Sequence, residues 1–158
     1  MKKLFFILTL SFYSNLFAQT NAEIIKYISN KLEVHDEYEN ITFSIKNCNL
    51  IIKYDQFKQD PEEPFYDPKV VVYTIPISEI DTDAINWKFI KYSYGTALEA
   101  YCKLLKGSKN FKREITPYST GITETEYVNS WILSYQYPTD ISPKLNSYFK
   151  KLVENCSK

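Results

Sequence analysis

The amino-acid sequence predicts an α+β fold with a helix at each end and antiparallel strands between them. Near the N-terminus, Ile24, Ile28 and Leu32 recur at helical spacing, and a second helical stripe occurs near the C-terminus. The region between them is dominated by alternation of apolar and polar residues, which is typical of strands. We therefore expect an N-terminal helix, about seven antiparallel strands forming a bent sheet or barrel, and a C-terminal amphipathic helix.

The first residues have the organisation of a cleavable signal peptide. Two lysines precede an almost unbroken apolar run over residues 4–12, and Ala18 offers a small residue at a cleavage point. The run is shorter than the roughly 20 apolar residues of a membrane-spanning helix, and no later segment is long and apolar enough to span. We expect a signal peptide over residues 1–18 and a single α+β domain over residues 19–158. The richness in Lys, Asn, Ile and Tyr is typical of an AT-rich bacterial genome, so the protein is expected to be bacterial and exported, either periplasmic or secreted.

The N-terminal helix has a start signal as well as an apolar stripe. Thr20 and Glu23 have the spacing of a capping box, in which both side chains bind backbone N–H groups of the first turn. Ile25 and Tyr27 widen the stripe, and the pattern ends near Leu32. This predicts a helix of about three turns.

The next two apolar runs predict a β-hairpin. Residues 41–45 and 50–54 alternate between apolar and polar, and the intervening Lys46-Asn47-Cys48-Asn49 has turn chemistry. Residues 55–68 are polar and acidic and contain three prolines. They are expected to form a long exposed loop.

Three further strands are expected after this loop. Residues 70–77 are dense in β-branched residues and predict a well-buried strand, near whose end Pro76 indicates an edge or a bulge. Residues 87–92 alternate and predict another strand. Residues 97–105 fit a helical face or one face of a strand, and the turn-like residues 106–110 that follow favour the strand.

The last strands and the C-terminal helix complete the predicted order. Residues 111–116 predict a strand, residues 117–126 a second loop, and residues 128–137 an alternating strand that includes Trp131. Ser142 is then a helix cap followed by proline at the first helical position. The apolar side of this helix comprises Leu145, Phe149, Leu152, Val153 and Cys156.

This order of strands and closing helix resembles the pleckstrin-homology-like barrel, in which the last helix closes one end of a bent sheet. The resemblance rests on the hairpin over residues 41–54, the five strands predicted after it and the helix over residues 143–156. It is also similar to small exported bacterial proteins of unknown role. The leading helix departs from the family pattern, and a lipocalin-like or other open α+β sheet is the alternative. The family binds phosphoinositides through basic residues after the first strand, where this chain has only Lys46. The resemblance therefore implies a fold and no lipid-headgroup site.

The chain has three cysteines, Cys48, Cys102 and Cys156. An exported protein resides in a compartment where disulfides can form. An odd number allows one bridge and one remaining thiol, and the sequence alone does not pair them. Three free buried thiols are the alternative.

Charge and glycine content argue against two classes of function. Lys and Arg number 19 and Asp and Glu number 19, whereas a nucleic-acid binder normally carries a clustered basic excess. Nucleic acid is therefore disfavoured as a partner. The three glycines are isolated, at Gly95, Gly107 and Gly121, so the clustered glycines of a phosphate-binding loop are missing.

No residue stands out as catalytic, cofactor-binding or metal-binding, and we expect no cofactor. His35 is the only histidine and follows the end of the predicted helix beside two acidic residues, which is typical of a solvated loop. The acidic residues between Asp55 and Asp67 lack the spacing and the glycine of a calcium loop. Glu99 and Glu126 flank apolar strands, as many surface glutamates do.

Aromatic residues make up 16% of the chain, which fits either a strand-rich core or a surface that stacks on sugars or anchors a protein. The sequence predicts an exported, non-enzymatic binding or interaction module, whose partner is an unknown protein or envelope component. The alternative is a small envelope hydrolase acting on a cell-wall or sugar substrate.

Overall fold

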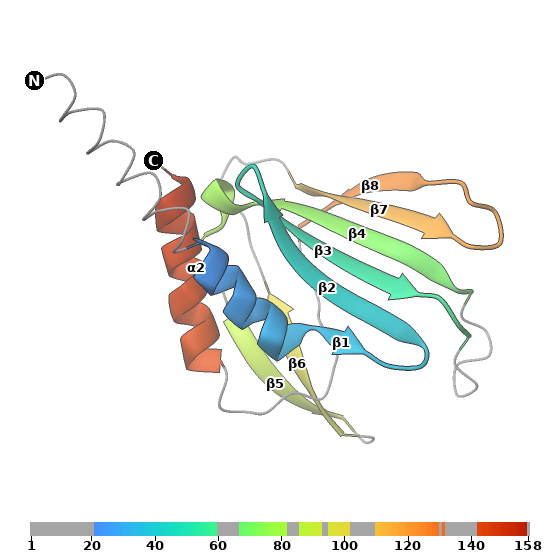
Figure 1. Cartoon of the computed structure of the whole chain (residues 1–158), viewed down its shortest axis with the longest axis horizontal. Coiled ribbons are helices and arrows are strands. Elements are labelled where there is room, and N and C mark those ends of the chain that lie inside the picture. The colour runs from blue at the N-terminus through green and yellow to red at the C-terminus, as the bar shows by residue number, and fades with distance from the viewer. Residues whose placement is uncertain are drawn as a thin grey trace, which may run out of the picture.

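The computed structural model describes residues 21–59, 67–81, 86–92, 95–101, 110–129, 131 and 142–157, and it describes residues 86–92 and 95–101 by their backbone. Within this part of the chain, antiparallel strands lie between an N-terminal and a C-terminal helix, which confirms the predicted α+β class (Figure 1). The predicted signal peptide, residues 1–18, and the predicted capping residue Thr20 lie outside the described residues.

The described strands number eight and pair in two antiparallel sheets. A six-stranded open sheet has the order β1-β2-β3-β4-β7-β8, and β5 pairs with β6 in a separate two-stranded sheet that lies beside the C-terminal helix. The strands are β1 (Val34–His35), β2 (Glu39–Lys46), β3 (Asn49–Gln56), β4 (Lys69–Pro76), β5 (Asn86–Tyr92), β6 (Gly95–Tyr101), β7 (Phe111–Pro117) and β8 (Glu124–Val128).

The predicted hairpin is confirmed as β2 and β3. Its two turn residues, Asn47 and Cys48, have φ of 50° and 54°. Positive φ at both positions is typical of the two-residue turns whose twist matches that of the flanking strands. Because the side chains of a strand alternate between faces, this turn also decides which residues of the hairpin face the core.

Several strand boundaries differ from the prediction. Asp55 and Gln56 belong to β3 and not to the predicted loop 55–68, because they continue the ladder with Asn40 and Glu39. The segment predicted as the loop 117–126 contains the start of β8. This strand has exposed residues on both faces and therefore no apolar alternation.

The ambiguous region 97–105 and the predicted strand 128–137 are each described only in part. β6 confirms the strand over residues 97–101. The described part of the chain does not include residues 102–105, most of the predicted turn 106–110, or residues 132–137. Trp131 lies in no strand.

β4 lies between β3 and β7 and ends at Pro76, which pairs with Asn49, so the predicted edge or bulge near this proline is not confirmed. Ile77 begins the 3-10 helix η1 (Ile77–Glu79), and its N–H donates to the carbonyl oxygen of Cys48 at 3.0 Å. The prediction of a well-buried strand is wrong for most of β4, in which Val71 and Ile75 are buried and the other six residues are half-buried. Alternate residues point to the other face of the sheet.

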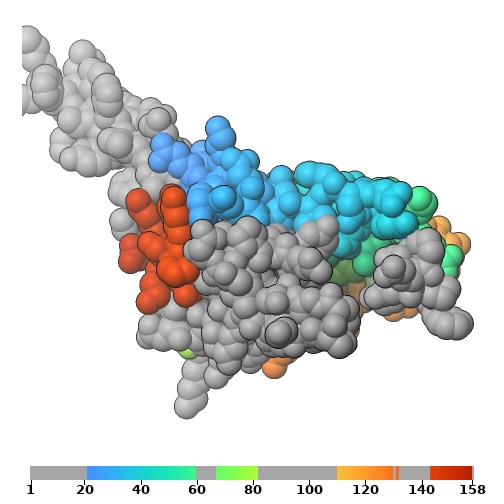
Figure 2. Space-filling model, turned by 90° about the horizontal axis from the view of Figure 1, so that it is seen from below, coloured from blue at the N-terminus to red at the C-terminus, as the bar shows by residue number. Residues whose placement is uncertain are grey.

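Both helices pack on the same face of the six-stranded sheet, here called the inner face. The N-terminal helix (residues 21–32) leads into β1 and β2 along one side of the molecule, and α2 (Ser142–Cys156) lies at one end (Figure 2). Their predicted stripes are buried in one cluster with the inner residues of the strands. The most buried members from the helices are Ile24, Ile28, Leu32, Leu145, Phe149 and Leu152.

Trp131 belongs to this core. It is 2% exposed, and its Nε1 donates a hydrogen bond to the hydroxyl of Tyr54 at 2.7 Å. Its ring also meets that of Phe43 edge-on, with centroids 6.0 Å apart. For this tryptophan, the core role proposed from composition is confirmed.

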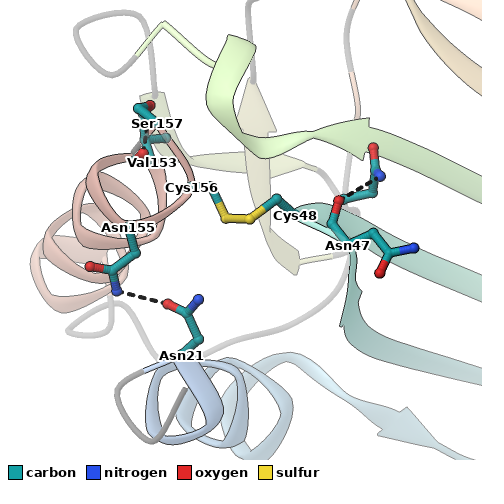
Figure 3. Close-up of a disulfide and its surroundings, with 8 residues drawn as sticks. Asn21, Asn47, Cys48, Val153, Asn155, Cys156 and Ser157 are labelled. Carbon is teal, nitrogen blue, oxygen red and sulfur yellow. Dashed lines mark hydrogen bonds between the residues drawn. A yellow bond between two sulfur atoms is a disulfide. The ribbon is translucent and has the colours of Figure 1, made fainter. Parts of the chain in front are cut away.

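A disulfide joins Cys48, in the β2–β3 turn, to Cys156, in the last turn of α2 (Figure 3). The predicted single bridge is thereby confirmed with a specific pairing, and Cys102 lies outside the described residues. Close to the bridge, Asn155 on α2 donates to the side-chain oxygen of Asn21 on the N-terminal helix at 2.7 Å. The two terminal helices and the hairpin turn are therefore linked at one end of the sheet.

Candidate functional site

The face of the six-stranded sheet that points away from the helices is here called the outer face. The alternation of side chains along each strand and the register between strands show which residues belong to the outer face. They include Thr42, Lys53, Val72 and Glu114, which lie opposite one another on successive strands. These four side chains are all half-buried. They are therefore accessible to a ligand while being held by their neighbours.

A shallow depression of about 260 Å³ lies at the β1–β3 side of the outer face. The register brings its residues together, because His35 lies opposite Asn40, Asn40 opposite Asp55, and Thr42 opposite Lys53. These five residues line the depression. It therefore offers an imidazole, an amide, a hydroxyl, an ammonium and a carboxylate within a small area.

Asp55 is the centre of a polar network in this depression. Lys53 Nζ donates to Asp55 Oδ2 at 2.6 Å, and the hydroxyl of Tyr118, which follows β7, donates to Asp55 Oδ1 at 2.5 Å. Burial alone would raise the pKa of the Asp55 carboxyl, but both hydrogen bonds and the charge of Lys53 outweigh it, so that pKa is lowered. The same hydrogen bond raises the pKa of the Tyr118 hydroxyl. At neutral pH the carboxyl of Asp55 is therefore ionised and the hydroxyl of Tyr118 is neutral.

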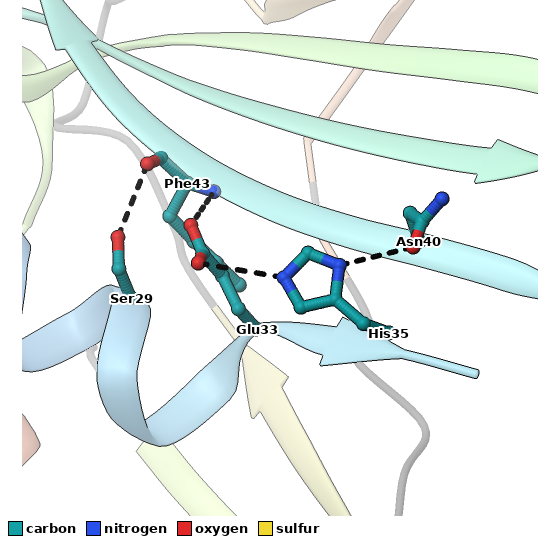
Figure 4. Close-up of polar contacts among 5 residues, drawn as sticks. All are labelled: Ser29, Glu33, His35, Asn40 and Phe43. Atoms are coloured by element: carbon teal, nitrogen blue, oxygen red, sulfur yellow. Dashed lines mark hydrogen bonds and ion pairs between the residues drawn. The ribbon is translucent and has the colours of Figure 1, made fainter.

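His35 lines the depression from β1 and not from a loop, although its exposure confirms the predicted contact with solvent. Its Nδ1 lies 2.9 Å from Asn40 Oδ1, and its Nε2 lies 3.8 Å from a carboxylate oxygen of Glu33 (Figure 4). Because the amide oxygen is an acceptor, Nδ1 is the donor of this pair. The hydrogen bond to Asn40 thus orients the ring.

The depression adjoins aliphatic side chains of β4. Val70 lies opposite Asp55, and Val72 lies opposite Lys53. Both valines are half-buried. A ligand in the depression can therefore meet hydrogen-bonding groups on β1–β3 and an apolar surface on β4.

No protein-family model, curated protein or solved structure matches this chain.

The other acidic candidates do not assemble into a metal site in the described residues. Asp67 accepts a hydrogen bond from the hydroxyl of Ser119 at 2.7 Å. Glu126 lies 2.7 Å from Arg113 Nε. Within the described ranges, no three His, Cys, Asp or Glu side chains are grouped closely enough to hold a metal ion. The remaining residues of the predicted acidic loop, Asp60, Glu62 and Glu63, lie outside those ranges.

Sequence reasoning did not single out Asn40, Thr42, Lys53 or Tyr118. Thr42 and Lys53 were within reach, because the alternation in the predicted strands 41–45 and 50–54 already places them on the polar face of the hairpin, and the same alternation extended by one residue places Asn40 there. Tyr118 was not within reach of sequence reasoning, since it lies 63 residues from Asp55 along the chain.

Among the described helices, none has the length and apolar character needed to cross a membrane.

Proposed function

We propose that the protein is an exported, non-enzymatic binding module that recognises a glycan of the cell envelope through the depression on its outer face. The observation that supports this most directly is the combination of amide, hydroxyl and ammonium groups with adjacent valines. A sugar presents hydroxyl groups at its edge and C–H groups on its faces, so it needs both kinds of contact. Small-ligand sites are generally built from an apolar surface and a few placed polar groups.

The disulfide supports export. Cys48 and Cys156 are joined, and structural disulfides persist in oxidising compartments such as the periplasm or the extracellular space. The predicted signal peptide over residues 1–18 is independent of this observation and leads to the same compartment.

The state of the carboxylate favours binding over hydrolysis. Glycosidases generally use two carboxyl groups, one of them with a raised pKa. Among the described residues, the lining of the depression includes one carboxylate, that of Asp55, whose pKa is lowered. Hydrolysis of an envelope component by a base such as His35, which is oriented by Asn40, is the second candidate function.

A glycan array bearing bacterial cell-wall and capsular oligosaccharides tests both candidates. The mature wild-type chain is expected to bind a subset of the glycans. Asn40→Ala and Lys53→Met should each weaken that binding about tenfold, as expected when a polar contact worth about 1.4 kcal/mol is lost. Lys46→Met is the matched control, because Lys46 is exposed at the turn end of β2 and does not line the depression.

The outcomes separate the proposals. Equal binding by Lys53→Met and Lys46→Met would contradict the placement of the site. Release of shortened glycans by the wild-type chain, abolished in His35→Ala, would replace the binding module by the hydrolase.

We also propose the pleckstrin-homology-like barrel as the fold of the complete domain. The presence of a second sheet, β5–β6, and of a C-terminal helix packed on the inner face supports it. Backbone contacts measured by NMR from β5 or β6 to the β1 end of the six-stranded sheet would be expected in a barrel that leaves the β8 edge open. Contacts to neither edge would support an open sheet.

A further inference from the structure

The two edges of the six-stranded sheet are treated differently. β1 covers β2 only at Asn40 and Ile41. Beyond β1, the N–H of Phe43 donates to Glu33 Oε1 and its carbonyl oxygen accepts from the hydroxyl of Ser29, both at 3.2 Å (Figure 4). Side chains from the N-terminal helix and the residue after it thus satisfy the backbone groups of Phe43, which disfavours pairing with another chain at this point of the edge.

The opposite edge is formed by β8 (Figure 1). β8 is five residues long, and among the described residues it pairs with β7 alone. The four residues from Glu124 to Tyr127 are all exposed. On alternate residues of such a strand, the N–H and C=O groups point away from the sheet and can pair with an incoming strand.

The side chains of β8 carry a pattern of charge. Glu124 and Glu126 share one face of the strand, and Thr125 and Tyr127 share the other. Arg113 on β7 pairs with Glu126, whereas Glu124 lies opposite the apolar Ile115. On the other face, Tyr127 is 65% exposed. The edge therefore presents the carboxylate of Glu124, a second carboxylate at Glu126 that is shared with Arg113, and an aromatic ring.

A second copy of this chain does not suit the edge. If two copies paired antiparallel over all five residues of β8, each Glu126 would lie directly opposite its own counterpart. Like charges at directly opposed positions destabilise a strand pair. An incoming strand with cations at alternate positions would instead be attracted to Glu124 and Glu126.

We propose that β8 binds an extended peptide segment of another protein that carries Lys or Arg at alternate positions and apolar residues between them. The segment adds to the sheet as a further strand. Its backbone pairs with β8, its cations face Glu124 and Glu126, and its apolar residues lie beside Tyr127. Strand addition of this kind derives affinity from the backbone and specificity from alternate side chains.

This surface is separate from the glycan site proposed above. The depression is lined by residues of β1, β2 and β3, and β4 and β7 lie between β3 and β8. Peptide binding at β8 therefore neither requires nor excludes a ligand in the depression.

The probe is a fluorescently labelled peptide of alternating lysine and valine, titrated into the mature chain and followed by anisotropy. Two control peptides are used. The first carries glutamate in place of lysine. The second keeps the lysines but is N-methylated at alternate residues, which removes the backbone N–H groups that would face β8. We expect binding of the first peptide and at least tenfold weaker binding of both controls. Equal binding of the N-methylated peptide would reduce the effect to charge attraction and overturn strand addition.

The variant Glu124→Lys tests the location. It should weaken binding of the lysine peptide about tenfold and strengthen binding of the glutamate peptide, a reversal that a misfolded chain would not show. Glu154→Lys is the matched control, since it makes the same charge change at an exposed position of α2. Equal effects of the two variants, or dimerisation of the wild-type chain that Glu124→Lys abolishes, would overturn the proposal.

Discussion

Cys48 and Cys156 are joined by a disulfide across a separation of 108 residues, with their Cα atoms 5.6 Å apart. The bridge ties the last turn of α2 to the turn between β2 and β3. It therefore holds α2 against the inner face, where Phe149 and Leu152 are buried.

Loss of this bridge should destabilise the protein. Cys48→Ser is expected to lower the free energy of unfolding by about 2–5 kcal/mol, because the unfolded chain regains the freedom that a long closed loop removes. Urea unfolding with and without reductant measures the effect. Cys102→Ser should keep the dependence on reductant, whereas Cys48→Ser should lose it. Unfolding the wild-type chain without reductant should reveal one free thiol, and a count of three would contradict the pairing.

Export should leave a shortened chain. The two lysines, the apolar run over residues 4–12 and Ala18 predict cleavage after residue 18. Mass spectrometry of the protein from its own cells is therefore expected to find an N-terminus near Gln19. A product that retains Met1 and stays in the cytoplasm would show that residues 1–18 are not a signal peptide.

The packing of α2 can be tested at Phe149, which is 4% exposed. Phe149→Ala should lower the free energy of unfolding by about 3–5 kcal/mol, because apolar contact is lost and a cavity remains. Lys151→Ala, at an exposed position of the same helix, should change it by less than about 0.5 kcal/mol. Urea unfolding of both variants beside wild type measures the difference. An unchanged midpoint and slope for Phe149→Ala would mean that α2 does not pack on this sheet.

The network around Asp55 should make a small part of the stability depend on pH. Because the folded-state pKa of Asp55 is lowered, the ionised form stabilises the fold. This contribution is present above the ordinary aspartate pKa of about 3.9 and is lost as the pH falls through the lower folded-state value. At pH 7, Asp55→Asn should cost at most about 1 kcal/mol, since the ion pair is partly exposed to solvent.

The measurement compares urea unfolding of wild type and Asp55→Asn from pH 7 down to pH 2. The difference between them should shrink below about pH 4. Tyr118→Phe removes one of the two hydrogen bonds and should reduce the pH-dependent part without abolishing it. A difference between wild type and Asp55→Asn that stays constant over this range would contradict the assigned role of the ionised carboxylate.

Local patterns in the sequence predicted the elements that bury one face. A half-buried helix or strand must repeat its apolar residues with its own period. This repeat allowed the prediction of the apolar stripes of the two helices, the β2–β3 hairpin and the order of most strands along the chain. The same alternation could have placed Asn40, Thr42 and Lys53 together. β8 was missed because a strand exposed on both faces has no such repeat.

The tertiary structure alone decided the contacts between distant segments. Three such contacts depend on which strands become neighbours and on which face the helices pack. They are the pairing of Cys48 with Cys156, the hydrogen bond from Tyr118 to Asp55, and the hydrogen bonds from Ser29 and Glu33 to the β2 edge. Local periodicity carries no information on those choices, because they arise from burying the apolar faces of all the elements in one core.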